Sequence, residues 1–166
     1  MYLTIKIIGC FLIVGASYLT GFQLSRSLHK RKDFLKSFGM FLTSLATNLR
    51  YNSEDIFTLV SSCARVEEMD IILPEKNKQA FEDAWHNKIK EIPKDYALTK
   101  SDKELLICFG FELGKTDTDG QLKHIELYKS VFEKQLLQAE EAVKSKSKLY
   151  QTMGLFIGIT ISLMII

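Results

Sequence analysis

The run Asp117-Thr118-Asp119-Gly120 is the stretch of the chain that most resembles a metal-binding loop. Two aspartates two residues apart could offer carboxylate oxygens to Ca²⁺, as at the start of an EF-hand loop. That loop also needs an oxygen ligand at its fifth position and a bidentate glutamate at its twelfth. Those positions hold Gln121 and Tyr128, and the glycine comes too early. We therefore interpret the run as a turn, followed by a capping pair of Thr118 and Gln121 at the start of a helix.

The other residues that could do chemistry do not form a reactive set. The histidines, at positions 29, 86 and 124, lack the spacing of a metal site, and His124 is expected off the inward face of its helix. Cys63 and Cys108 fall on apolar helix positions without a basic activator, so we expect buried structural thiols. No phosphate-binding loop, dinucleotide fingerprint or nucleophile elbow occurs. We predict no catalytic, cofactor-binding or metal-binding residues, and a protein that is not an enzyme.

The chain has two apolar stretches, one at each end, and these must position the central part of the chain between them. Residues 7–25 carry no charged side chain at neutral pH, and as a helix they would reach about 28 Å, close to the ~30 Å hydrocarbon thickness of a bilayer. Residues 149–166 are also free of charge. We predict transmembrane helices at 3–25 and 149–166, with a helical bundle at 26–148 between them. Basic residues flank both spans on their inner sides and are expected at the lipid bilayer surface: Arg26, Lys30, Arg31, Lys32, Lys144, Lys146 and Lys148.

Each apolar stretch has an alternative interpretation. The first could be a cleaved signal peptide, with Lys6 as its basic region and a cleavage site at Val14-Gly15-Ala16. Against this, the apolar run continues through Leu24, and the basic cluster would have to be translocated directly after cleavage. The second stretch, at the lower limit of length for a span, could be a buried core helix. Its Gly154 and Gly158 have the spacing of a close helix–helix contact, which the first span could provide.

Charge is separated along the chain. Between residues 37 and 143 there are 13 basic and 19 acidic residues, so the central part is acidic while its membrane-proximal edges are basic. A nucleic-acid-binding protein would carry a basic stripe on the central part itself, so we expect no nucleic-acid partner. Basic flanks on both spans place the central domain in the cytoplasm. Three cysteines, an odd number, argue against a disulfide framework.

Periodic apolar residues predict helices throughout the central part. After the first span, Phe34, Phe38, Phe41, Leu45 and Leu49 follow one helix face up to about residue 52. Ser53 is expected to cap the next helix, and residues 71–73 to form an extended tie before Pro74. Residues 80–89 predict a third short helix, which ends before Pro93.

The last two helices of the central part have recognisable ends. Ser101 and Glu104 form a predicted capping box, and Gly114 is placed to end that helix. The final helix is expected from about Asp119 as one continuous rod into the second span. The sequence therefore predicts an all-α fold, a bundle of about five or six helices.

Together these residues resemble the stage III sporulation protein AB family. The resemblance covers essentially the whole chain, and its most specific part is residues 98–127. The motif there reads Ser101-x-Lys103-Glu104…Phe109-Gly110-x-x-Leu113-Gly114-x-x-Asp117-x-x-x-Gln121. Other matching stretches are Ile8-Gly9 through Gly21-Phe22, Leu45…Leu49-x-Tyr51, Ala84-Trp85 and Gly154-Leu155. The chain departs from the family pattern at Ala46, Asn48 and Asp55, so a carboxylate role at the first two positions is not carried over.

The resemblance implies a sporulation protein of the outer forespore membrane whose domain faces the mother-cell cytoplasm. The family is similar to cytoplasmic domains of inner-membrane platform proteins of type II secretion and type IV pilus systems. By that analogy the protein docks a secretion-type ATPase, the AA protein of the same operon, beneath a channel between mother cell and forespore. The motif residues would then be structural or partner-facing, and a homo-oligomer is compatible with this role.

Two other classes of function remain open from the residues. A membrane-anchored sensor could relay a signal through the long last helix and the second span, but it would need a polar pocket in the bundle. A membrane-bound enzyme would need a titratable cluster in the core. Neither feature is evident in the sequence.

Overall fold

The computed structural model describes residues 2–51, 55–74 and 80–165, and these form two long helices with a cluster of short ones. The long helices are α1 (Tyr2–Tyr51) and α5 (Thr118–Ile165), of 50 and 48 residues. At 1.5 Å per residue each is about 70–75 Å long. The short elements are α2 (Ile56–Val66), the 3₁₀ turn η1 (Asp70–Ile72), α3 (Phe81–Glu91), the 3₁₀ turn η2 (Lys94–Tyr96) and α4 (Lys100–Glu112). The described residues contain no strand, so the predicted all-α fold is confirmed.

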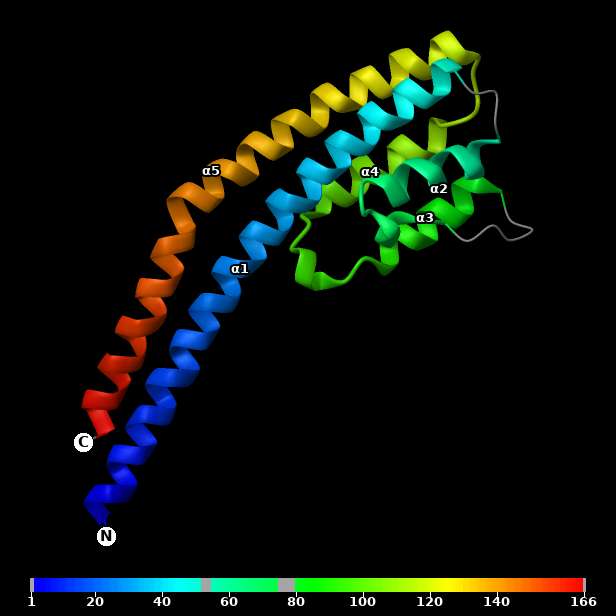
Figure 1. The fold of residues 1–166 in the computed structure, drawn as a ribbon. Coiled ribbons are helices and arrows are strands. Elements are labelled where there is room, and N and C mark those ends of the chain that lie inside the picture. Colours follow the sequence, from blue (N-terminus) through cyan, green and yellow to red (C-terminus); the bar gives the residue numbers. More distant parts are fainter. Residues whose placement is uncertain (1, 52–54, 75–79, 166) are drawn as a thin grey trace.

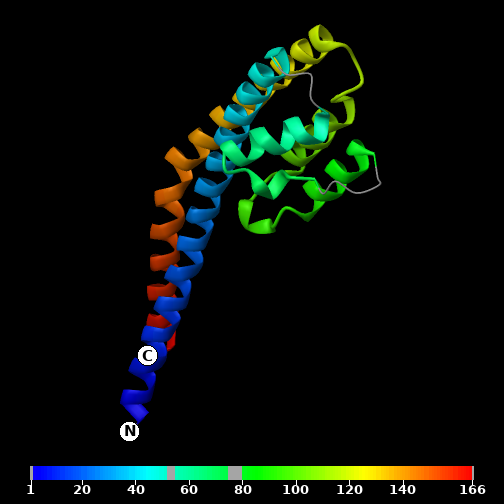
Figure 2. The same ribbon diagram turned by 45° about the vertical axis from the view of Figure 1, so that its right-hand side comes forward.

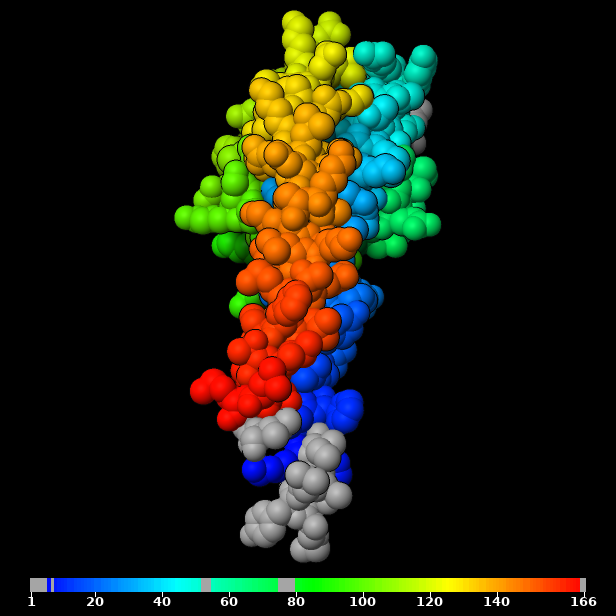
Figure 3. All heavy atoms as spheres, turned by 90° about the vertical axis from the view of Figure 1, so that its left-hand side faces the viewer, coloured from blue at the N-terminus to red at the C-terminus, as the bar shows by residue number. Residues whose placement is uncertain are grey.

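The long helices run antiparallel and lie side by side over most of their length (Figure 1). The short helices gather against one end of this pair, and both termini lie at the other end (Figures 1 and 2). We call the end that carries the termini the stalk and the end that carries α2–α4 the head. In the space-filling view α5 covers α1 along the stalk, with the short helices visible on both sides higher up (Figure 3).

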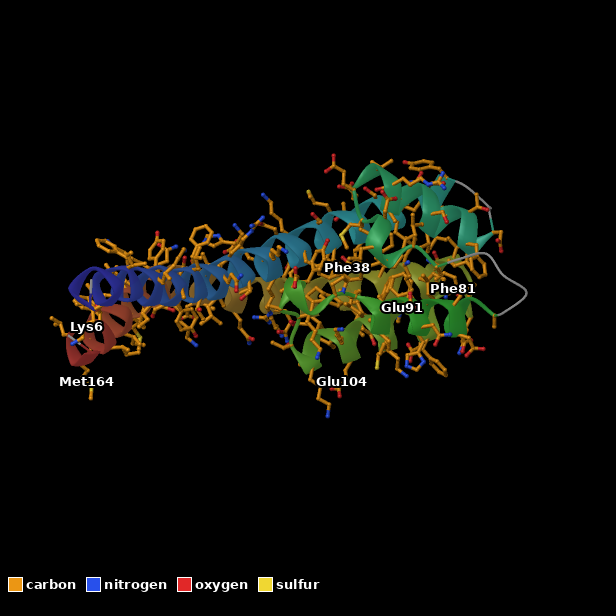
Figure 4. All side chains as sticks on the ribbon, turned by 90° about the horizontal axis from the view of Figure 1, so that it is seen from below. Lys6, Phe38, Phe81, Glu91, Glu104 and Met164 are labelled. Atoms are coloured by element: carbon orange, nitrogen blue, oxygen red, sulfur yellow. The ribbon has the colours of Figure 1, made fainter. Side chains whose placement is uncertain are left out.

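The head is held together by one apolar core. The predicted stripe on α1 is confirmed, since Phe34, Phe38, Phe41 and Leu45 are all buried. From α5, Ile125, Phe132 and Ala139, spaced seven residues apart, join the same buried core. The short helices add further buried residues: Leu59, Val60, Cys63, Ile72, Trp85, Ile89, Leu106 and Phe109. In Figure 4 the labelled Phe38 and Phe81 lie in the head, whereas Glu104 stands at its outer edge.

The predicted continuity of the last helix is confirmed, since α5 continues without a break to Ile165. The first apolar run and the stripe after it, predicted as a span followed by an amphipathic helix, form the single helix α1. The helix predicted over residues 80–89 is α3, which ends at Glu91 before Pro93. The expected cap at Ser53 lies outside the described residues.

Two local predictions are wrong. Residues 71–73 were expected to be extended, but Asp70–Ile72 form the turn η1, closed by a hydrogen bond from the Leu73 amide to the Asp70 carbonyl at 3.1 Å. Only Leu73, directly before Pro74, is extended, because proline restricts the residue before it. The capping box of α4 consists of Thr99 and Asp102 instead of Ser101 and Glu104, because the helix begins two residues earlier, at Lys100.

Candidate functional site

The run that resembles a calcium loop is a helix cap. Asp117 precedes α5, and its Oδ1 accepts a hydrogen bond from the Gly120 amide at 3.0 Å. The predicted turn holds only up to Asp117, because Thr118, Asp119 and Gly120 already belong to the first turn of α5. Asp117 is therefore the capping residue where Thr118 was expected. Among the described residues, no group of three His, Cys, Asp or Glu side chains is placed to hold a metal ion.

Gln121 joins the end of α4 to the start of α5. Its side chain is buried, and its Oε1 accepts from the Gly114 amide at 2.9 Å while its Nε2 donates to Thr116 Oγ1 at 2.9 Å. Gly114 has a φ of 86°, a left-handed conformation that favours glycine, which confirms its predicted role after the helix end. Leu113 beside it is buried. These motif residues fix the α4–α5 corner.

Phe109 is the meeting point of four helices. Its ring centroid lies 5.7 Å from that of Phe38 on α1, 6.0 Å from that of Trp85 on α3, and 5.5 Å from that of Tyr128 on α5. His124 stacks on the same ring at 5.4 Å, and its Nε2 lies 3.0 Å from the Phe109 carbonyl oxygen. The prediction that His124 lies off the inward face is wrong, because the bend of the chain at Gly114 brings α4 over it.

Gly110 makes room for Trp85. A Cβ atom at Gly110 would overlap the indole ring, so no larger residue fits without displacing it. The indole Nε1 donates a hydrogen bond to the Leu106 carbonyl at 2.7 Å. Glu104, by contrast, is exposed and pairs only with Lys100 of its own helix, at 3.7 Å. Glu104 is therefore free to meet a partner, as are the exposed Gly114 and Asp117 of the same motif.

A buried ion pair, which the sequence reasoning missed, connects α1 to α4. Arg31 donates from Nε to Asp102 Oδ2 at 2.7 Å and from Nη2 to Asp102 Oδ1 at 3.0 Å, and Nη2 also reaches Gln135 Oε1 at 3.2 Å. The Asp102 side chain is fully buried and that of Arg31 nearly so. Burial raises the pKa of Asp102, but hydrogen bonds from Arg31 and Thr99 outweigh it and hold the pKa below its usual range. The expected membrane-surface position of Arg31 is thus wrong, because its guanidinium points into the head.

The other basic residues near the stalk are at the surface. Arg26, Lys144, Lys146 and Lys148 are exposed. Lys30 and Lys32 are partly covered and lie near carboxylates, with Nζ 3.4 Å from Asp95 Oδ2 and 3.0 Å from Asp33 Oδ1 respectively. Their predicted place at a bilayer surface stays a prediction.

Small residues bring α1 and α5 together along the stalk. A Cβ atom at Gly154 would stand 2.7 Å from the Ser17 carbonyl oxygen, and one at Gly158 would stand 2.9 Å from the Val14 Cα. Ser17 Oγ donates to the Gly154 carbonyl at 2.6 Å. The spacing of Gly154 and Gly158 therefore marks close packing against the first apolar run, the option left open above. Gly21 packs in the same way, whereas Gly9 and Gly15 face open space.

The three cysteines differ in their surroundings. Cys63 is buried as expected; burial raises the pKa of its thiol more than the hydrogen bond from Asn48 lowers it. Cys108 is exposed, so the prediction that it is buried is wrong. It lies on α4 between the inward Leu106 and Phe109 but on the solvent side of the helix. Cys10 is buried between the stalk helices.

One helix among the described residues, over 8–51, is long and apolar enough to cross a membrane by length and composition, with a mean hydropathy of 1.5 in its most apolar window. Only 17% of that window is buried, which suggests membrane association. This helix is nearly the whole of α1, so it belongs to both the stalk and the head.

The comparisons with known proteins agree on one family. The family model for stage III sporulation protein AB matches residues 6–166. The chain is also similar to the stage III sporulation protein AB of Bacillus subtilis (strain 168), with 25% identity over 169 residues, which cover 97% of this chain and 99% of that protein. No solved structure matches. Since the match to the family extends over nearly the whole chain, including the Glu104–Gln121 motif, the chain belongs to the stage III sporulation protein AB family.

Proposed function

We propose that this protein is a non-enzymatic platform of a sporulation-specific channel or secretion complex, anchored in the outer forespore membrane by both ends of its chain. In this proposal residues 3–25 and 149–166 span the bilayer as a helix pair. The head, residues 26–148, lies in the mother-cell cytoplasm and docks a secretion-type ATPase, the AA-type protein of the same operon. Membership of a family named for sporulation, and for no reaction, supports this role.

The pairing of the two apolar ends is the observation that supports the proposed membrane anchor. The C-terminal part of α5 packs on residues 14–21 of α1 through glycine contacts, so if one enters a bilayer the other enters with it. The outer faces of both carry large apolar side chains that are mostly exposed, with Phe11 76% and Phe156 67% exposed. Exposed apolar surface of this extent on a helix pair matches the hydrocarbon core of a bilayer.

The observation that supports a docking role is the rigid link between stalk and head. α1 and α5 pass from one to the other without a break, and the Arg31–Asp102 pair fixes α4 to the point where they enter the head. A force applied to the head would therefore reach the stalk through packed helices. The solvent faces of α2 and α3, which point away from α1 and α5, are the free surface for an ATPase; Thr58, Ser62, Asp83 and Asn87 are exposed there.

The exposed Cys108 offers a test of the topology. A membrane-impermeant maleimide is expected to label Cys108 in inverted membrane vesicles and not in intact cells that express the full chain. Cys63 is expected to react far more slowly, because it is buried and its raised pKa leaves little thiolate. The readout is the mass of the labelled peptide, with Cys108→Ser as the control that abolishes labelling. Rapid labelling of Cys108 in intact cells would contradict a cytoplasmic head.

The docking role is tested by photo-crosslinking in sporulating cells. A photoreactive amino acid at Thr58 or Asp83 is expected to capture the ATPase of the same operon, whereas the same group at Phe156 is expected to capture lipid or a membrane protein. Both head positions are exposed, so the fold tolerates the larger side chain. If photoreactive groups on the solvent faces of α2, α3 and α4, including Glu104, recover no ATPase while the head stays folded, the docking proposal is wrong.

A further inference from the structure

A hollow lies where the apolar part of α1 gives way to its basic part. It has a volume of about 600 Å³ and is lined by one stripe of α1, from Thr20 through Leu24 to Lys30, and by Lys94 and Asp95 of η2. This volume is within the range of sites that hold small ligands, about 300–1,000 Å³. The stripe covers about 15 Å of the helix axis, so the hollow extends from the last apolar turn into the basic flank.

The turn η2, which forms the other side of the hollow, is fixed by contacts with α1 and α4. η2 packs against α1 through Tyr96. The Tyr96 ring contacts the Phe34 ring edge-on, with the two centroids 5.7 Å apart. On its other side Ile92 is buried, and its carbonyl accepts a hydrogen bond from Lys103 Nζ of α4 at 3.1 Å. Lys94 is thus presented to α1 by a turn that is tied to two helices.

The hollow carries a net positive charge. Arg26, Lys30 and Lys94 line it against one carboxylate, Asp95, which lies 3.4 Å from the Lys30 amine. Within the described ranges Arg26 and Lys94 have no ion-pair partner. Leu24, half exposed, is the apolar side chain of the lining, and the polar Thr20 and Gln23 lie further toward the stalk. Two unpaired cations near an exposed leucine complement a ligand with an anionic head and an apolar tail.

We infer that this hollow binds the phosphate headgroup of one anionic glycerophospholipid of the surrounding membrane, with Arg26 and Lys94 on the phosphate and the acyl chains along Leu24. The inference rests on the proposed insertion of the stalk into the bilayer. Bound in this way, the lipid bridges α1 and η2 and fixes the height of the head above the membrane.

The test measures how the full chain selects lipids in phosphatidylcholine nanodiscs that contain a trace of spin-labelled lipid. Spin-labelled phosphatidylglycerol is expected to be immobilised more than spin-labelled phosphatidylcholine. Lys94→Gln and Arg26→Gln are each expected to weaken this preference roughly fivefold, equal to about 1 kcal/mol for one cation near a membrane surface. Both side chains are exposed, so the variants keep their fold, which circular dichroism checks.

Lys148→Gln is the matched control, since it removes one exposed cation from the other basic flank. If Lys148→Gln and Lys94→Gln weaken the preference for phosphatidylglycerol equally, the preference comes from diffuse surface charge, and the proposed binding site is wrong. Competition by inorganic phosphate at the same concentration as the lipid would show a free-anion site and would also overturn it. A chain that enters nanodiscs but shows no lipid preference refutes this inference alone, whereas a chain that fails to enter them refutes the proposed membrane anchor as well.

Discussion

Replacing Asp102 with alanine is expected to lower the free energy of unfolding by about 3–5 kcal/mol, the usual cost of removing one partner of a buried ion pair. The change leaves the Arg31 guanidinium with only Gln135 in a site from which water is largely excluded. It also removes the carboxylate that accepts the Thr99 amide at 2.8 Å and so caps α4. The measurement is chemical denaturation of the full chain in detergent micelles, followed by circular dichroism.

Glu104→Ala is the matched control for this variant. Both carboxylates lie near the start of α4, but Glu104 is exposed and pairs only with Lys100, so its loss is expected to cost less than about 0.5 kcal/mol. The double variant Arg31→Met/Asp102→Leu is expected to recover most of the stability, because it leaves no unpaired charge. Equal stabilities of Asp102→Ala and Glu104→Ala would show that the pair contributes nothing to the fold.

The Asp102 carboxylate also makes the free energy of unfolding depend on pH. Because the pKa of Asp102 is lower in the folded chain than the ordinary value of about 3.9, its contribution is fully present above that value. It is lost as the pH falls through the lowered pKa of the folded state. Acid titrations of the free energy of unfolding are therefore expected to fall less steeply below about pH 4 in Asp102→Asn than in the unchanged chain. Identical slopes would contradict the assignment.

The long helices could be predicted because their signal is local. Apolar residues recur along one face from Phe34 to Leu45, and nothing in the sequence interrupts the last helix before its apolar end, so the buried stripe of α1 and the rod α5 follow from spacing alone. Gly114 could be assigned because a glycine after an apolar face has few other roles. Such features depend on neighbours within a few residues.

The features that sequence reasoning missed depend on residues far apart in the chain. Arg31 and Asp102 are 71 positions apart, and each has a plausible local role, one beside a span and the other within a helix start. Thr99 and Ser101 are both suitable caps, and with Thr99 as the cap its partner Asp102 is also the residue that pairs with Arg31 of α1. Cys108 lies between two inward residues, so only the packing of α4 decides that it faces solvent. Tertiary contacts decide these cases, and a single sequence does not display them.

Replacing Phe109 with alanine is expected to lower the free energy of unfolding by about 3–5 kcal/mol, the range for a large aromatic residue in a packed core. Its ring is fully buried and meets rings from α1, α3 and α5, so the cavity would be lined by three helices that cannot all close on it. Trp85 is the only tryptophan of the chain and lies against that ring, so its fluorescence follows the loss of structure directly.

Phe111→Ala removes the same side chain two residues further along α4 and serves as the control. Phe111 is 57% exposed, and the Lys115 amine lies over its ring at 3.5 Å from the centroid. An exposed cation–π contact contributes only about 0.5–1 kcal/mol, so the two phenylalanines are expected to differ several-fold in their effect. A loss below about 1 kcal/mol in Phe109→Ala, or one no larger than in Phe111→Ala, would mean that α4 is rotated about its axis. In that case the motif from Phe109 to Gln121 would face a partner, and the head would need another centre of packing.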